Sequence, residues 1–451
     1  MNFILHTYGC QMNVRDSEAT EAMLTAAGHT RAETEAEADL VIVNSCSVRG
    51  KAEDKAIGKL GLLCATKRER SNRIVGLMGC MAQRLGTDIF KKVPGLDFSV
   101  GTRRCGAIPR MVSRVMAGES HITEISSPDE IPDVPDAHLE QGFSAFVTIL
   151  LGCNRRCAYC IVPDVRGPEF SRPAREIIAE ITTLAHHGIK EITLLGQSVM
   201  NYGLANRAWL DDDPISIQGF TEPFSRLLEA VASIPGIVRI RFTSGHPSGC
   251  TNELVRAVSL FPKICHHLHL PVQSGSDVIL AAMRRGYTRA DYLDAIRRLR
   301  AVMPDFALTT DVIVGFPGET AEDFEETRRL MNQADFDNAF IFKYSPRPGT
   351  PAASMKDDVT APEKMRRNQV LLADQDIRGE AANQRLMGSL QEVLVEGPSL
   401  RNETRWAGRS PGNKIVVFTP VAGILPGTLV NIRITRVAPQ TLYGEVLQKN
   451  G

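Results

Sequence analysis

The sequence lacks the features that mark membrane, secreted and strongly charged proteins. It contains no run of about 18 apolar residues, so we expect no membrane-spanning helix. The first residues, Met1 to His6, do not place a basic stretch before an apolar one, as a signal peptide does. The formal net charge is +0, from 52 basic and 52 acidic residues, so any nucleic-acid site must come from local clustering. We therefore expect a cytoplasmic protein without a membrane partner.

Ten cysteines need an explanation other than disulfides. The cytoplasm keeps thiols reduced, and cysteines there most often bind metals or take part in catalysis. Hydrophobic residues make up 43% of the chain and charged residues 23%, which is typical of folded globular proteins. A chain of 451 residues is long enough for two or three domains. The places of the cysteines within these domains should therefore decide what they bind.

Residues 1–120 alternate short apolar runs with helical patterns. The predicted strands are Phe3–Thr7, Leu40–Val43 and Arg73–Met78, and the predicted helices are Ser17–Ala27 and Val48–Cys64. Strands that alternate with helices predict βαβ units and a parallel sheet. We therefore expect a small, doubly wound α/β domain here. Residues 121–140 contain Pro128, Pro132 and Pro135 and six acidic residues without Lys or Arg, which predicts an extended, self-repelling linker.

The alternation of strands and helices resumes in residues 141–380. The predicted strands are Ala145–Leu150, Glu191–Leu195, Arg239–Thr243, His267–Leu270, Ala307–Val314 and Ala339–Lys343. The predicted helices include Arg175–His187, Phe224–Ser233, Asn252–Leu260, Arg289–Val302 and Ala321–Ala334. Six such units predict a (β/α) barrel or partial barrel, with functional groups at the C-terminal ends of the strands.

The last part of the chain has a different pattern. Residues 363–385 predict one helix rich in Lys, Arg and Gln. In residues 384–449, the short alternating runs Leu390–Glu396, Lys414–Phe418, Thr428–Ile434 and Gly444–Leu447 predict a small all-β barrel. Eight basic residues, Lys449 among them, face four acids there, an excess of 8 − 4 = +4 in a neutral protein. This excess makes the barrel a candidate RNA-binding domain.

Three cysteines lie close together directly after the first predicted barrel strand. Cys153, Cys157 and Cys160 have the spacing C-x3-C-x2-C. Three thiolates this close can hold one iron–sulfur cube, which needs soft ligands, and would leave one iron open to a small molecule. A zinc site is the alternative, although zinc usually shows paired C-x-x-C units and four ligands.

A second set of cysteines lies in the first domain. Cys10, Cys46 and Cys80 are far apart in the sequence, but each follows a predicted strand. The carboxyl ends of parallel strands converge on one edge of a sheet, so these three can meet in space. The alternative is that they are small buried apolar residues. The other four cysteines share no spacing, and we interpret them as structural; they are Cys64, Cys105, Cys250 and Cys265.

Several motifs of the chain, taken in order, resemble the radical S-adenosylmethionine methylthiotransferase family. They are Thr7-Tyr8-Gly9-Cys10-Gln11-Met12-Asn13, Asn44-Ser45-Cys46-Ser47-Val48-Arg49, Gly79-Cys80-Met81-Ala82-Gln83-Arg84 and Cys153–Cys160 with an aromatic before its last cysteine. The C-terminal barrel resembles a TRAM domain, which binds RNA. The chain departs from the family at Asp164-Val165-Arg166-Gly167, where Tyr-Thr-Arg-Gly is more usual.

This resemblance implies two four-iron (4Fe-4S) clusters and S-adenosylmethionine as cofactors. The cluster on Cys153, Cys157 and Cys160 would cleave S-adenosylmethionine to a 5'-deoxyadenosyl radical. The auxiliary cluster on Cys10, Cys46 and Cys80 would supply sulfur, and a second S-adenosylmethionine the methyl group. A flavodoxin-type reductant and cluster- and sulfur-assembly proteins are implied as partners.

The resemblance also suggests a substrate. Residues 9–13 resemble the branch that modifies N(6)-dimethylallyladenosine in the tRNA anticodon stem-loop. Other branches modify threonylcarbamoyladenosine in tRNA or an aspartate of a ribosomal protein. A non-enzymatic RNA-binding protein that carries a cluster or zinc is the alternative from another class.

Weaker predictions concern the contacts around these cofactors. Gln197, Ser244, Gln273 and Asp311 lie near strand ends and could bind S-adenosylmethionine, or be loop and cap residues. Arg284 and Arg285 could bind a carboxylate or phosphate, or be a solvated helix end. We interpret His266, His267 and His269 as part of a strand near the core rather than as a metal site. RNA contact is expected on the basic barrel and on the preceding helix, where a solvated charged face is the alternative; the helix residues are Lys364, Arg366, Arg367 and Arg378.

Overall fold

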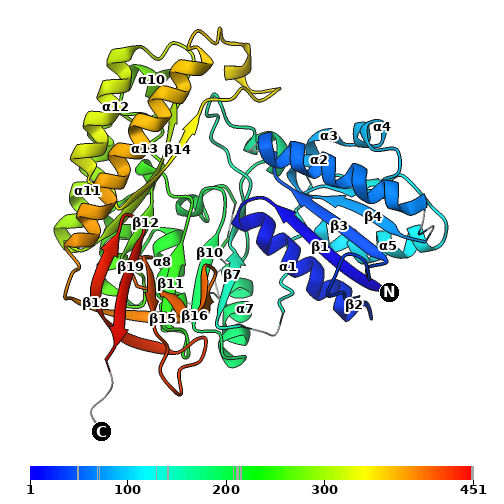
Figure 1. Ribbon diagram of the computed structural model, residues 1–451, viewed down its shortest axis with the longest axis horizontal. Coiled ribbons are helices and arrows are strands. Elements are labelled where there is room, and N and C mark those ends of the chain that lie inside the picture. Colours follow the sequence, from blue (N-terminus) through cyan, green and yellow to red (C-terminus); the bar gives the residue numbers. More distant parts are fainter. Residues whose placement is uncertain are drawn as a thin grey trace.

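The computed structural model describes residues 1–47, 50–68, 70, 72–127, 130–139, 142–206, 208–209, 213 and 216–447. Parts of the predictions above lie outside these residues, namely Val48, Arg49, Pro128, Asp129, Glu140 and Lys449. An α/β unit, a larger β/α unit and a small β-barrel follow one another along the chain (Figure 1). Within the described residues, no helix is long and apolar enough to cross a membrane.

A six-stranded parallel sheet with the order β2-β1-β3-β4-β5-β6 forms the first unit. Its strands are β1 (Asn2–Tyr8), β2 (Thr30–Arg31), β3 (Leu40–Ser45), β4 (Ile74–Met78), β5 (Phe98–Val100) and β6 (Ile122–Glu124). The helices are α1 (Gln11–Ala26), α2 (Gly50–Ala65), α3 (Cys80–Leu85), α4 (Asp88–Lys92) and α5 (Ile108–Met116). Leu40 and Ile42 of β3 pack toward α1 and α5, whereas Val41 and Val43 pack toward α2, α3 and α4. Because both faces are buried, the strand reads as a continuous apolar run, and the predicted doubly wound domain is confirmed.

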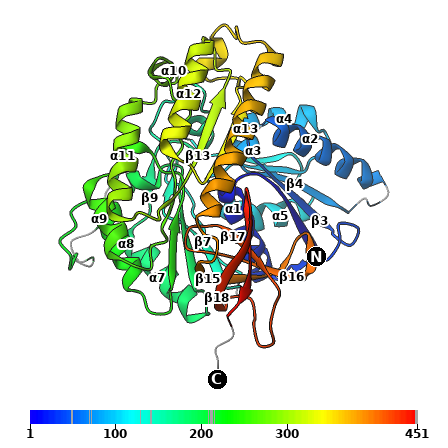
Figure 2. The same ribbon diagram turned by 60° about the vertical axis from the view of Figure 1, so that its left-hand side comes forward.

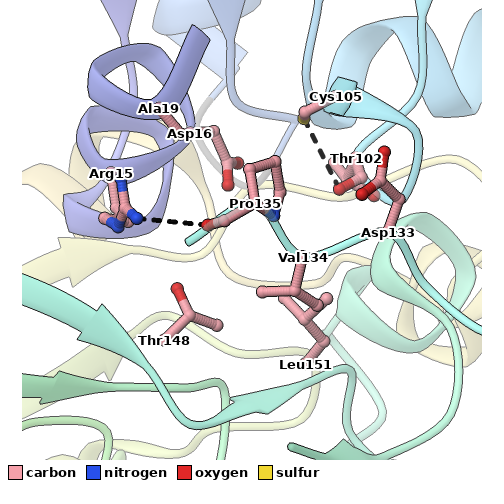
Figure 3. A pocket seen from close by; sticks show the side chains of 10 residues that line it. All are labelled: Arg15, Asp16, Ala19, Thr102, Cys105, Asp133, Val134, Pro135, Thr148 and Leu151. Atoms are coloured by element: carbon pink, nitrogen blue, oxygen red, sulfur yellow. Dashed lines mark hydrogen bonds between the residues drawn. The ribbon is translucent and has the colours of Figure 1, made fainter. Parts of the chain in front are cut away.

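Two parts of the predicted linker, residues 122–124 and the segment around Val134, pack against the folded units. Residues 122–124 form β6, the edge strand of the first sheet. Further on, Val134 packs against Met12, Leu151 and other apolar residues of the two flanking units. Figure 3 shows Arg15 of α1 directed at the Pro135 carbonyl, to which its Nη2 donates at 3.1 Å. The cavity beside them, of about 10 Å³, has room for about one water molecule, so the segment is packed between the two units.

Six parallel strands form the predicted partial barrel. They lie in two three-stranded sheets with the orders β11-β10-β7 and β12-β13-β14, joined by a bridge between Ile240 and Ile264. The strands are β7 (Ser144–Thr148), β10 (Glu191–Leu195), β11 (Arg239–Phe242), β12 (His267–His269), β13 (Ala307–Val314) and β14 (Asn338–Lys343). The helices between them are α7 (Ala174–His186), α8 (Pro223–Ser233), α9 (Asn252–Leu260), α10 (Asp277–Ala282), α11 (Arg289–Val302) and α12 (Ala321–Ala334). The predicted partial barrel is therefore confirmed.

A long helix, α13 (Ala361–Gln384), runs along the partial barrel to the small barrel (Figures 1 and 2). The small barrel is closed, with the order β15-β16-β17-β19-β18. Its strands are β15 (Leu390–Ser399), β16 (Asn402–Arg409), β17 (Ile415–Phe418), β18 (Leu429–Ala438) and β19 (Thr441–Val446). The sequence predicted four of these strands and missed β16, whose first four residues are exposed and polar.

The small barrel packs against the N-terminal ends of the partial-barrel strands. Arg239, at the start of β11, donates to the Arg409 carbonyl at 2.6 Å, and Arg241 donates to the carbonyls of Ser410 and Pro411. A cavity of about 950 Å³ lies between the two barrels. The C-terminal ends of the partial-barrel strands, where the loop with Cys153, Cys157 and Cys160 lies, are at the opposite end of the partial barrel.

Candidate active site

The loop that carries Cys153, Cys157 and Cys160 follows β8 (Leu150–Leu151) and is held by its neighbours. Gly152 has φ +76°, and a Cβ there would lie 2.0 Å from the Pro168 carbonyl oxygen, so only glycine fits. The Gly152 amide donates to Gln197 Oε1 at 2.6 Å, and the Cys153 amide to the Gly167 carbonyl at 3.1 Å. These bonds fix the start of the loop at the C-terminal end of the partial barrel.

A buried arginine contacts the middle cysteine of this loop. Arg285 Nη1 donates to Cys157 Sγ at 3.2 Å, and its Nη2 donates to the Pro271 carbonyl at 3.1 Å. Burial raises the pKa of the Cys153 thiol, and it raises the pKa of Cys160 to about 12, to which the neighbouring cysteine sulfurs also contribute. A bound metal would therefore have to displace the protons of these thiols.

Cys10, Cys46 and Cys80 come together at the carboxyl edge of the first sheet. Cys10 precedes α1, Cys46 follows β3, and Cys80 begins α3 directly after β4 and Gly79. Since β1, β3 and β4 are adjacent in the sheet, their C-terminal ends converge. The Cys46 thiol hydrogen-bonds to the other two sulfurs, which lowers the pKa of Cys10 to about 5 and of Cys80 to about 7 and raises that of Cys46.

Two buried asparagines lie beneath this set. Asn13 Nδ2 donates to Asn44 Oδ1 at 2.8 Å, and Asn44 Nδ2 donates to the Asn13 carbonyl at 2.8 Å. Asn13 Oδ1 accepts from Cys10 Sγ at 3.3 Å. A Cβ at Gly9 would lie 2.4 Å from Asn13 Oδ1, and one at Gly79 would lie 2.4 Å from Asn44 Oδ1. The glycines of the two motifs are therefore required by this amide pair.

One short helix, α6 (Val162–Arg166), separates the two cysteine sets. Cys80 packs against Ile161 and Val165, and Ile161 directly follows Cys160. Thr102 Oγ1 of the first unit donates to the Val165 carbonyl at 2.7 Å. Arg166 Nη2 donates to Asp16 Oδ2 of α1 at 2.8 Å. The structure therefore places both predicted sets at one interface between the first unit and the partial barrel.

The residues of both sets fit iron–sulfur clusters by their chemistry. Thiolates are the soft ligands that such clusters need, and a buried guanidinium offsets negative charge at each set, Arg285 at one and Arg166 at the other. Within the described part of the chain, no three His, Cys, Asp or Glu side chains close around a single metal ion.

Of the other predicted cofactor residues, Gln197 and Ser244 follow strands β10 and β11, whereas Asp311 lies in the middle of β13 and not near its end. Gln197 is engaged by the Gly152 amide, and Ser244 and Gln273 have the positive φ values of 63° and 75°. Asp311 Oδ1 lies 3.5 Å from His269 Nε2. Arg284 is exposed, whereas Arg285, the second member of the predicted pair, contacts the cysteine loop. Contact of any of these residues with S-adenosylmethionine stays a prediction.

Two of the three histidines belong to a strand, as we interpreted them, whereas His266 lies just before that strand and is partly exposed. His267 and His269 are in β12, and each has a ring nitrogen within 3.2 Å of Thr309 Oγ1. Burial lowers the pKa of His267 well below its usual value, so this ring is neutral. The interpretation of the remaining cysteines as structural agrees with the burial of Cys105, Cys250 and Cys265.

The predicted RNA contacts are wrong for two residues of α13. Lys364 is buried and paired with Asp357, and Arg367 is buried and paired with Glu319. They lie on the helix face that packs on the protein, so they cannot reach RNA. Arg366 is exposed although it pairs with Glu363, and Arg378 is half-buried.

The sequence did not point to a role for Arg166 or Asn44. Arg166 lies six residues after the last cysteine of the loop and reaches the other set only through the docking of two units. Asn44 was part of the motif around Cys46, and its position on the buried strand β3 was the one available signal. A polar residue at the end of an apolar strand is typical of a hydrogen-bonded support.

Comparisons with known proteins cover the whole chain. Residues 147–331 match the Radical SAM superfamily, residues 2–101 the Uncharacterized protein family UPF0004, and residues 384–447 the TRAM domain. A solved radical S-adenosylmethionine methyltransferase, TsrM from Kitasatospora setae, has a TM-score of 0.56 at 14% identity, covering 78% of this chain and 75% of that one. That likeness supports the radical SAM fold alone.

Two curated relatives are similar over nearly their full length. The tRNA-2-methylthio-N(6)-dimethylallyladenosine synthase of Akkermansia muciniphila is 43% identical, covering 98% of this chain and 97% of that protein. The protein of the same name from Syntrophus aciditrophicus is 44% identical, covering 98% and 94%. Identity at this level over all three units leaves no unit unmatched. The chain therefore belongs to the tRNA-2-methylthio-N(6)-dimethylallyladenosine synthase family of radical S-adenosylmethionine enzymes.

Proposed function

We propose that the chain attaches a methylthio group to carbon 2 of N(6)-dimethylallyladenosine next to the tRNA anticodon. The observation that carries this proposal is the meeting of Cys10, Cys46 and Cys80 beside the Cys153–Cys160 loop, with α6 between them. One thiolate set suits radical generation and the other suits sulfur delivery. The full-length relatives carry the name of the same activity.

Each set has a separate task in this proposal. Cys153, Cys157 and Cys160 would hold a four-iron cluster that would supply the electron for cleavage of S-adenosylmethionine, and Cys10, Cys46 and Cys80 would hold a second cluster that would supply sulfur. Arg285 holds Cys157 in place and offsets the negative charge of the thiolates. Asn13 orients Cys10, and Thr102 fixes α6 between the sets. The polypeptide thus holds the two thiolate sets next to each other.

The small barrel provides the surface for RNA. Its Lys and Arg residues exceed its acids, and an exposed loop with Leu400 and Arg401 joins β15 to β16. An anticodon loop has bases that can be turned out of the stack and recognised individually. This property suits an active site at the C-terminal end of the partial barrel, where the Cys153–Cys160 loop lies. A cytoplasmic setting, a flavodoxin-type reductant and cluster-assembly proteins belong to the same proposal, because the chemistry needs low-potential electrons and iron–sulfur assembly.

Nucleoside analysis tests this function directly. tRNA from a strain without the gene is digested and its nucleosides are identified by mass spectrometry, with a complemented strain as the control. We expect 2-methylthio-N(6)-dimethylallyladenosine to disappear and N(6)-dimethylallyladenosine to accumulate. A normal profile would contradict the proposal, and loss of a threonylcarbamoyl derivative instead would move the substrate to that branch.

A further inference from the structure

A buried arginine joins the two cysteine sets. Arg166 ends α6, its side chain is 3% exposed, and its Nη2 is bound to Asp16. Its Nη1 is also buried but has no hydrogen-bond partner in the part of the chain that the structure describes. Leaving a buried charged donor unpaired is costly, so such a group usually indicates an acceptor that the polypeptide does not supply.

This guanidinium belongs to the short helix that packs against the early cysteine set. Cys80 packs against Val165, the residue before Arg166. The nearby Arg103 is buried as well, but it donates to the carbonyls of Arg166 and Glu130 instead. Arg103 is therefore a second buried arginine at the same interface whose guanidinium is bound to backbone carbonyls.

We propose that Arg166 is a positioning residue whose free Nη1–H group binds anionic sulfur held by Cys10, Cys46 and Cys80. This inference rests on the proposed function, since it requires an iron–sulfur cluster at that set. Arg166 then holds the sulfur on the side of α6, which faces the Cys153–Cys160 loop. A fixed positive charge favours the more negative, reduced form of a cluster, so Arg166 raises the reduction potential of that cluster.

The experiment measures that potential with only the early set loaded. The full chain with Cys153, Cys157 and Cys160 all changed to Ala is reconstituted anaerobically, and its midpoint potential is followed by electron paramagnetic resonance. Asp16→Asn serves as the reference, so that no buried carboxylate is left unpaired when Arg166 is changed. The test variant is Asp16→Asn with Arg166→Gln, and Arg103→Gln is the matched control for loss of a buried guanidinium.

We expect the midpoint potential of the double variant to be more negative than that of Asp16→Asn, with no change in Arg103→Gln. Faster loss of iron to a chelator in the double variant, at an unchanged unfolding temperature, would support the same conclusion. Equal potentials and equal iron retention would overturn the role of Arg166 and leave the proposed function intact. Absence of iron from the parent protein with three alanines would instead overturn the cluster assignment in the proposed function.

Discussion

The two cysteine sets are built in different ways. Cys153, Cys157 and Cys160 lie within eight residues on one loop, so local backbone bonds bring them together. Cys10, Cys46 and Cys80 span 71 positions and meet only because β1, β3 and β4 are neighbours in one sheet. The geometry of the first set therefore depends on the local backbone of one loop, whereas that of the second set depends on the pairing of strands in the first sheet. Damage to the sheet should therefore reach the second set and leave the first in place.

Removal of one cysteine from each set gives the largest expected difference. Cys157→Ala should abolish formation of 5'-deoxyadenosine and of the methylthio product, because the radical source is lost. Cys46→Ala should retain 5'-deoxyadenosine and lose only the methylthio product. Liquid chromatography with mass spectrometry measures both products in one reaction. Cys250→Ala, a buried cysteine outside both sets, is the control and should retain both. Formation of the full amount of methylthio product by Cys46→Ala would show that the two cysteine sets do not have separate tasks.

A substitution of Arg285 tests the support of the cysteine set on the loop. Arg285→Gln should slow the cleavage of S-adenosylmethionine about 10- to 100-fold, since a hydrogen bond to a charged group contributes about 1.5–3 kcal/mol. Arg284→Gln, at the exposed neighbouring position, should leave the rate within about twofold. Single-turnover formation of 5'-deoxyadenosine measures both. A larger decrease in Arg284→Gln than in Arg285→Gln would contradict this role of Arg285 and support the predicted contact of Arg284 with the cofactor.

A substitution of Asn44 tests the support of the early cysteine set at the edge of the sheet. Asn44→Ala leaves the buried Asn13 Nδ2 group without its acceptor and removes one hydrogen bond to Ser17 Oγ, which should lower the free energy of unfolding by about 2 kcal/mol. The iron of the early set should be lost faster to a chelator, while cleavage of S-adenosylmethionine continues. Asn383→Ala removes a buried amide far from both sets and is the control. Equal iron loss in both variants would show that general destabilisation explains the effect.

His138 gives the smallest expected effect, through the contact between the units that hold the two sets. Burial alone would lower its pKa, but hydrogen bonds to Glu18 and Glu180 raise the pKa overall. The stabilisation by the charged ring is complete below the ordinary pKa of 6.5 and is lost as pH rises through the folded-state value. Urea unfolding at several pH values should show this loss in the parent and not in His138→Gln. A pH-independent difference between the two would contradict it.

Much of the fold could be predicted because its signals are local. Apolar strands such as Leu40–Val43 and the spacing of Cys153, Cys157 and Cys160 are visible within a few residues. The rule that parallel strands end at one edge also predicted that Cys10, Cys46 and Cys80 lie close together. Their part in binding metal stays a prediction.

The errors concern contacts between segments that are separate in the sequence. Lys364 and Arg367 lie on the stripe of α13 that also buries Leu371, and their charges are neutralised by acids from other segments. The sequence predicted an extended linker around Val134, because the apolar partners of this residue come from both flanking units. Arg166 reaches the early cysteines for the same reason. Composition and periodicity describe one segment at a time, so they do not show which charges docking will bury.

Iron content measured together with cleavage activity tests most directly whether the two sets hold separate clusters. The parent chain should bind about eight irons, as two four-iron clusters. Changing Cys10, Cys46 and Cys80 to Ala should leave about four irons and full reductive cleavage of S-adenosylmethionine. Changing Cys153, Cys157 and Cys160 should leave about four irons and no cleavage. If the variant without Cys10, Cys46 and Cys80 retained about eight irons, or if it lost all of its iron, two independent cluster sites would be contradicted.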